Sequence, residues 1–118
     1  MKMLILDDTR NRRNALVNAL QKKRIDAAAF YSSNDFITAV EKNKFDLLLL
    51  DMESWNRGKA VYNYFRIAKR LLEKLPILFY NADPGFSVLN DRPRHAKDRI
   101  LCKPTEAETV IANLQENR

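Results

Sequence analysis

Four consecutive leucines that end in an acid, within the segment Phe45–Asp51, constrain the fold most strongly. The run has neither a helical nor an alternating period, so it predicts a short strand that is buried on both faces of a parallel sheet. Asp51 then stands at the carboxyl end of this strand. Because open α/β sheets bind their ligands at that edge, we expect Asp51 to face a functional site.

Strand patterns alternate with helical patterns along the rest of the chain. The expected strands are Met3–Asp7, Ile25–Tyr31, Phe45–Asp51, Ile77–Asn81 and Arg99–Cys102. The expected helices are Arg10–Lys23, one opening at Ser32–Ser33, Lys59–Lys74, a turn or two within Phe86–Asn90, and a last one carrying Ala107, Val110, Ile111 and Leu114. This alternation predicts one α/β domain over residues 1–118, with a doubly wound, flavodoxin-like parallel sheet of five strands in the order 2-1-3-4-5, flanked by five helices.

Local signals mark the ends of these elements. Asp8 or Thr9 can cap the first helix, and Thr105 with Glu108 matches a capping box for the last helix. The segment Met52–Gly58 is expected to be a loop. These signals agree with the alternation of strands and helices.

Composition narrows the functional classes. Hydrophobic residues make up 46% of the 118 residues, which is typical of a globular domain. No apolar run approaches the roughly 20 residues that cross a membrane. The single cysteine, Cys102, allows no internal disulfide and predicts a cytoplasmic location. The chain has no glycine-rich nucleotide-binding motif and no Cys/His spacing for zinc.

The predicted topology brings several polar residues to one edge of the sheet. Asp7 and Asp8 end the first strand and Asp51 ends the third, which is its neighbour, while Asn81 and Lys103 end the next two strands. Three clustered carboxylates repel one another, and Mg²⁺ is the natural counter-charge because it prefers oxygen ligands. A carboxylate can accept a phosphoryl group while a metal and a lysine neutralise its oxygens. The pattern therefore indicates phosphoryl chemistry.

The ordered set of strand ends resembles the response-regulator receiver domain of two-component signalling (the CheY-like family). The segments that carry the resemblance are Leu4–Asp8, Phe45–Asp51, Pro76–Ala82 and Cys102–Pro104. Their separations fit the family, and the resemblance covers essentially the whole chain. It implies a regulatory phosphoacceptor rather than an enzyme. Such a phosphoacceptor at most catalyses its own phosphorylation and dephosphorylation.

The resemblance also implies a role for each site residue. Asp51 matches the phosphoacceptor. Asp7 and Asp8 match the acidic pair that binds Mg²⁺, with Asp8 the more direct ligand, and Glu53 would add its backbone carbonyl. Lys103 matches the lysine that contacts the phosphoryl group, aimed by a cis bond before Pro104.

Several positions depart from the family's pattern, among them Asn81, Ile100 and Trp55. Asn81 stands where receivers usually have the Thr or Ser that bonds the phosphoryl group and transmits the switch. Ile100 stands where they usually have Tyr or Phe, and Trp55 where they usually have proline. The resemblance therefore implies retained phosphorylation chemistry with altered signal transmission.

The implied partners are a sensor histidine kinase or histidine phosphotransfer protein, docking at the first helix, and a downstream effector. A homodimer would form through the fourth helix, the strand Arg99–Cys102 and the last helix. A membrane partner is not expected, and nucleic acid is not expected for this domain alone. Two other functions stay open: a pseudo-receiver that binds proteins without phosphorylation, and a nucleic-acid-binding domain that uses its basic faces.

Each candidate residue also has a structural reading. The acids could cap a helix or lie in a loop, Lys103 could be a solvated lysine, and Asn81 could be a turn residue without a phosphate contact. The chain has a net charge of +6, and its basic residues gather in the predicted first helix and around the start of the last predicted strand. These basic residues are Arg10, Arg12, Arg13, Lys22, Lys23, Arg24, Arg92, Arg94, Lys97 and Arg99. They form either a solvated surface or a contact for an acidic partner.

Overall fold

The chain folds into a five-stranded parallel sheet with the strand order β2-β1-β3-β4-β5. The computed structural model describes residues 1–51, 60–64, 77–82, 99–102 and 106–116. The strands are β1 (Lys2–Leu6), β2 (Asp26–Phe30), β3 (Leu47–Asp51), β4 (Ile77–Ala82) and β5 (Arg99–Cys102). The helices are α1 (Arg10–Lys22), α2 (Ser33–Lys42) and α4 (Ala107–Glu116), and residues 60–64 are also helical. The predicted sheet and its order are confirmed.

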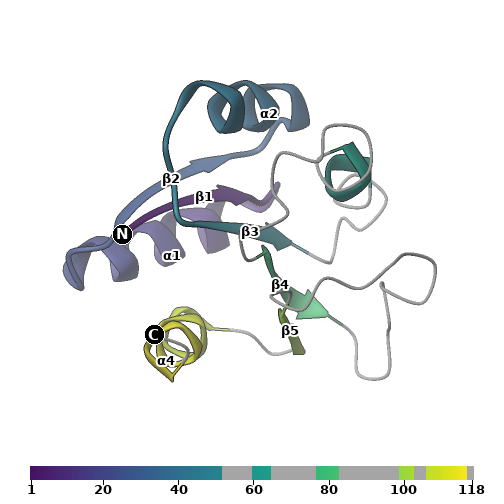
Figure 1. Cartoon of the computed structure of the whole chain (residues 1–118). Coiled ribbons are helices and arrows are strands. Elements are labelled where there is room, and N and C mark those ends of the chain that lie inside the picture. Colours follow the sequence, from purple (N-terminus) through teal and green to yellow (C-terminus); the bar gives the residue numbers. More distant parts are fainter. Residues whose placement is uncertain (52–59, 65–76, 83–98, 103–105, 117–118) are drawn as a thin grey trace.

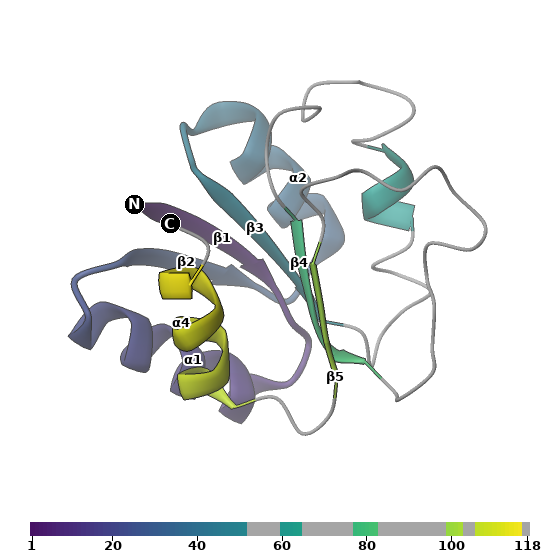
Figure 2. The ribbon, with the colours of Figure 1, turned by 60° about the horizontal axis from the view of Figure 1, so that its bottom comes forward.

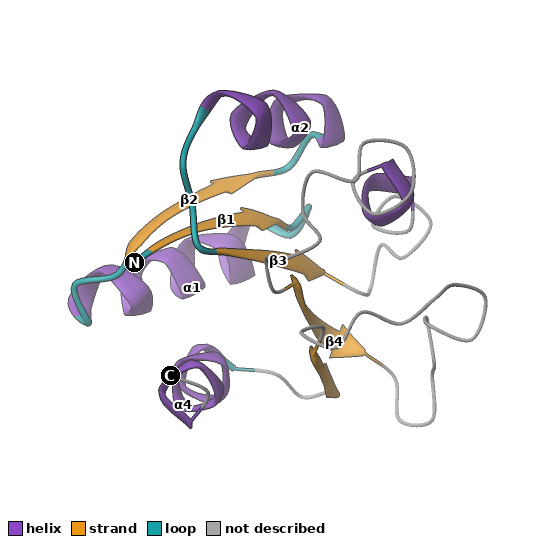
Figure 3. Cartoon of the chain, viewed as in Figure 1, coloured by secondary structure: helices purple, strands orange, loops and turns teal. Residues whose placement is uncertain are grey.

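Helices cover both faces of this sheet (Figure 1). The view turned by 60° shows α1 and α4 side by side on one face, with α2 and the helical residues 60–64 on the other (Figure 2). The colouring by secondary structure shows the same layers (Figure 3). Among the described helices, none has the length and the hydropathy to cross a membrane. The predicted helix Phe86–Asn90 and the predicted loop Met52–Gly58 lie outside the described residues.

The leucine run occupies the middle of the sheet, as its pattern predicts. Leu48 and Leu50 pack into the core on the α2 side, where Phe36 and Tyr62 also lie. Leu47 and Leu49 pack into the core on the α1 and α4 side. Each of the four leucines is at most 4% exposed, and burial of such a side chain contributes about 2 kcal/mol to folding.

The predicted element bounds need small corrections at strand ends. β1 ends at Leu6 rather than at Asp7, and β3 begins at Leu47 rather than at Phe45. Asp46 instead holds the segment before β3 against the first residue of β1. Its backbone N–H donates to the carbonyl of Lys2, and its carboxylate accepts from the Lys2 N–H. Asp7 therefore lies in the turn between β1 and α1, where its side chain can face the edge of the sheet.

Candidate phosphoacceptor and metal site

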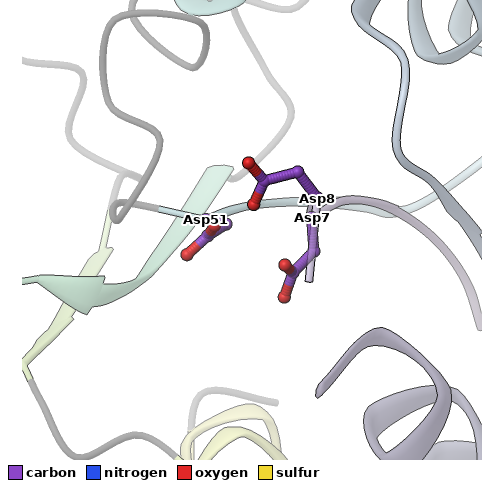
Figure 4. Close-up of side chains that lie close together, drawn as sticks. All are labelled: Asp7, Asp8 and Asp51. Atoms are coloured by element: carbon purple, nitrogen blue, oxygen red, sulfur yellow. The ribbon is translucent and has the colours of Figure 1, made fainter. Parts of the chain in front are cut away.

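Three carboxylates meet at the carboxyl edge of β1 and β3. These strands are neighbours and Leu6 pairs with Leu50, so Asp7 and Asp8 follow β1 at the level where Asp51 ends β3. One oxygen from each carboxylate lies within 4.8 Å of the others (Figure 4). Asp7 and Asp51 are buried, while Asp8 is exposed. The predicted convergence of the three acids is therefore seen in the structure.

The chemistry of this cluster suits a hard divalent cation. Its donors are carboxylate oxygens at the end of a parallel sheet, and Mg²⁺ binds through one or two such carboxylates with water completing its shell. The exposed Asp8 gives the cluster an opening to solvent. The residues present therefore fit a magnesium site with Asp7, Asp8 and Asp51 as its side-chain ligands.

A guanidinium group of the chain itself lies in this cluster. Arg12, in the first turn of α1, places its Nε 2.7 Å from Asp7 Oδ2 and one terminal nitrogen 2.9 Å from Asp7 Oδ1. The same nitrogen lies 2.8 Å from Asp51 Oδ2. The Arg12 side chain is only 21% exposed. The prediction that Arg12 belongs to a basic surface is therefore wrong, because this side chain is the counter-charge of two buried acids.

Asp7 is held by donors on both of its oxygens. Oδ1 accepts from the backbone N–H of Thr9 and from Arg12, and Oδ2 accepts from Arg12 Nε and from the hydroxyl of Tyr80. A carboxylate has about four lone-pair sites, so these bonds use the hydrogen-bonding capacity of Asp7. Thr9 stands at the N-cap position of α1 without a side-chain capping bond. Asp7 is thus a structural anchor as well as a candidate ligand.

The Tyr80 hydroxyl stays protonated in this environment. Burial, followed by the negative charges of Asp7 and Asp51, raises the pKa of Tyr80 far above its ordinary value. The neutral hydroxyl can therefore donate to Asp7 across the whole physiological pH range. This bond links β4 to the end of β1.

Asn81 departs from the expected site in its backbone. It is buried, with a φ angle of 60°, in the left-handed region. Asparagine tolerates this region better than most residues, whereas a β-branched residue there is an outlier. The pairing of β4 with β5 also shifts register between Phe79 and Ala82, which flanks this residue. The backbone thus supplies a structural reason for asparagine instead of the Thr or Ser that the receiver resemblance implies at this position.

The position of Ile100 in β5 belongs to the apolar core. Ile100 packs against the core cluster that contains Phe79 and Tyr62. The rings of Tyr62 and Phe79 meet edge to face, with centroids 5.3 Å apart. Ile100 therefore fills this position as a packing residue.

The remaining predicted site residues lie outside the described residues. Lys103 directly follows Cys102, whose backbone pairs with Ala82 at the end of β4. Glu53, Trp55 and Pro104 also fall in undescribed segments. Their roles stay predictions.

Sequence reasoning missed two residues of the site, Arg12 and Tyr80. A signal for Arg12 was present, because it lies five residues after Asp7 and the cluster needs a positive charge. Its neighbours Arg10 and Arg13 made it look like one member of a basic surface. Tyr80 looked like one more apolar residue of a buried strand, and its hydroxyl gave no pattern of its own.

Comparison with solved structures places this geometry in a known fold. The CheY4 chemotaxis response regulator of Vibrio cholerae superposes with a TM-score of 0.80 over 98% of this chain and 96% of its own, at 20% identity. The Francisella response regulator 1452 receiver domain gives 0.78 at 17% identity, covering 98% of this chain and 93% of its own. The chain has the fold of a response-regulator receiver domain.

A further comparison agrees on the receiver fold. A two-component response regulator from Clostridium difficile matches with a TM-score of 0.72 at 23% identity, over 98% of this chain and 93% of its own. No protein-family model matches the sequence, and no curated protein matches it. At these identities the likeness shows the fold alone, so the function has to be argued from the acidic site.

Proposed function

We propose that this receiver fold accepts a phosphoryl group on Asp51, with Mg²⁺, in a two-component or phosphorelay pathway. The observation that carries the proposal is the convergence of Asp7, Asp8 and Asp51 at the carboxyl edge of the sheet, with oxygens within 4.8 Å. Asp51 ends the central strand of the sheet and is buried, so its carboxylate is presented from the core of the fold.

The transfer step uses groups of the chain in defined roles. An oxygen of Asp51 attacks the phosphorus atom in line, the new O–P bond forms, and the bond from phosphorus to the donor breaks. The donor is a phosphohistidine or acetyl phosphate, and its nitrogen or oxygen leaves with the bonding electrons. Bound Mg²⁺ would neutralise the phosphoryl oxygens. Lys103, just past β5, would be the second positive charge on these oxygens.

The proposed function implies two kinds of partner. A sensor histidine kinase or a histidine phosphotransfer protein would supply the phosphoryl group in the cytoplasm. An effector domain or protein, or a second copy of the chain, would read the surface that the receiver resemblance assigns to the predicted fourth helix, β5 and α4. The same chain would act as a regulatory phosphoacceptor rather than as an enzyme with a separate substrate.

The test is phosphorylation of the purified chain. Incubation with acetyl phosphate and Mg²⁺ should add one phosphoryl group to the intact protein, as seen by mass spectrometry, and beryllofluoride should change the fluorescence of the single tryptophan, Trp55. The Asp51→Ala variant should show neither response. A wild-type chain that responds to neither reagent would contradict the proposal.

A second candidate function is a pseudo-receiver that binds a partner without phosphorylation. The observation that favours it is Arg12, whose guanidinium already compensates the two buried acids. This candidate predicts partner binding that Asp51→Ala leaves unchanged. Retention of an effector by both the wild type and Asp51→Ala, without phosphorylation of either, would select it.

A further inference from the structure

We propose that Arg12 is an internal cation of the acidic site, which a divalent cation must displace before it binds between Asp7 and Asp51. The inference rests on the proposed function only in naming the same metal site. It adds that the chain carries its own competitor for that site. Such a competitor lowers metal affinity and keeps the site closed until enough cation is present.

The contacts of the guanidinium show the competition. Arg12 approaches Asp7 with two nitrogens, at 2.7 and 2.9 Å, and reaches Asp51 at 2.8 Å with one of them. A cation coordinated by both carboxylates would compete with Arg12 for Asp7, because Arg12 contacts both oxygens of Asp7, and it would meet Arg12 again at Asp51 Oδ2. The two positive groups would also repel each other at these separations. Simultaneous binding of both is therefore unfavourable.

The hydrogen bonds that Asp7 already accepts make it still harder for Arg12 and a metal ion to bind there together. Its oxygens accept four hydrogen bonds, from Thr9, from Tyr80 and twice from Arg12. The Thr9 donor is a backbone N–H at the start of α1, and the Tyr80 donor is fixed in the core. Arg12 is the donor on a long side chain, so it is the one that can leave without unfolding an element.

Burial explains why Asp7 and Asp51 need a positive charge beside them. Asp7 is fully buried and Asp51 is 3% exposed, so two neighbouring carboxylates without a positive charge would be strongly unfavourable. Arg12 meets this need in the metal-free protein. Asp8 is exposed, so a cation arriving from solvent reaches one ligand before Arg12 has moved.

The structure also provides a place for the displaced side chain. Arg12 lines a groove of about 600 Å³ between α1 and α4. Glu106 and Glu108, at the start of α4, line the same groove and are exposed. An arginine that leaves Asp7 and Asp51 therefore finds carboxylates on the neighbouring helix. Metal binding would thus move charge from the site to the α1–α4 surface.

The test measures Mg²⁺ binding to the full chain by isothermal titration calorimetry, without any phosphoryl donor. The Arg12→Gln variant should bind Mg²⁺ about tenfold or more tightly than the wild type, because the competing ion pair is gone. Arg10→Gln is the matched control, since it removes an equal charge from an exposed position of the same helix. It should leave the affinity within about twofold.

Thermal unfolding gives a readout that does not depend on calorimetry. With a chelator present, Arg12→Gln should melt below the wild type, because two buried acids have lost their counter-charge. Saturating Mg²⁺ should narrow or reverse that difference, since the variant gains more from the metal. If Arg12→Gln does not fold, Arg12→Lys keeps the charge but cannot bridge two carboxylates with a planar fork, and should bind Mg²⁺ more tightly than the wild type.

The outcomes separate this inference from the proposed function. Equal Mg²⁺ affinity in wild type, Arg12→Gln and Arg12→Lys would overturn the competition and leave the metal site intact. Weaker binding by the Arg12 variants would also overturn it. Binding by none of them would overturn both proposals. In the wild type, the Arg12 Nε–H signal in an NMR spectrum should shift on Mg²⁺ addition, and an unchanged signal at metal saturation would contradict displacement.

Discussion

The two halves of the sheet's carboxyl edge are built differently. On the β1–β3 half, buried acids meet in a register that follows directly from the strand pairing. On the β4–β5 half, the register shifts, Asn81 adopts a left-handed backbone, and Ile100 packs into the core. The first half holds the acidic cluster that fits a phosphoacceptor site. The second half lacks the hydroxyl and the aromatic residue that the receiver resemblance leads one to expect. The two halves of one edge thus differ in their polar groups and in their backbone.

Removal of Asp7 tests the β1–β3 half with the largest expected effect. Asp7→Ala leaves the Tyr80 hydroxyl without its carboxylate and Arg12 with Asp51 alone, so we expect a loss of about 3–5 kcal/mol in the free energy of unfolding. Urea denaturation with a chelator present measures it. Asp8→Ala is the control, because an exposed acid should change this free energy by about 0.5 kcal/mol or less. Equal effects of the two variants would show that Asp7 is no anchor.

Tyr80 connects the two halves, and its removal should have the next largest effect. Tyr80→Phe deletes the hydrogen bond to the buried Asp7 carboxylate, which should cost about 1.5–3 kcal/mol at neutral pH. Because the folded state raises the pKa of Tyr80, only the unfolded chain releases this proton near the ordinary value of about 10. Stability from this group is therefore full below that pH and is lost as the pH rises above it.

The pH dependence gives the Tyr80 prediction its control. The difference in unfolding free energy between the wild type and Tyr80→Phe should be constant from neutral pH to about 9 and should shrink above about 10. Measurements of both proteins in urea at each pH provide it. A difference that stays constant into alkaline conditions would mean that Tyr80 is not held protonated by the fold.

The difference between the halves also explains what sequence could predict. The leucine run and the alternation of strands and helices determine the sheet order, and the sheet order alone brings Asp7, Asp8 and Asp51 together. These are consequences of backbone geometry and periodic burial. Arg12 could not be placed the same way, because its role depends on where a long side chain turns at the first turn of α1. The left-handed backbone of Asn81 likewise depends on the local mismatch between β4 and β5.

Replacement of Asn81 by the residue usual in receivers tests the β4–β5 half. Asn81→Thr restores the hydroxyl but places a β-branched residue at a φ angle of 60°, so we expect a loss of about 1–2 kcal/mol in the free energy of unfolding. Asn81→Gly should cost less, since glycine adopts this backbone without strain. A threonine variant at least as stable as the wild type would show that the backbone does not select asparagine.

Substitution of Arg24 should have the smallest effect on the free energy of unfolding. It measures the cost of a left-handed backbone at a position away from the site. It follows α1 with a φ angle of 62°, and the N–H groups of Arg24 and Ile25 donate to the carbonyls of Gln21 and Leu20. This is the Schellman ending, in which glycine is the usual residue at the left-handed position. Arg24→Gly should therefore raise the free energy of unfolding by about 0.5–1 kcal/mol. Lys23→Gly is the control and should not stabilise, because Lys23 has a φ angle of −93°. A gain at Arg24 with no such gain from Asn81→Gly would mean that the amide of Asn81 makes contacts that outweigh its backbone strain. Similar gains at both positions would show that the contacts of the Asn81 amide do not offset this strain.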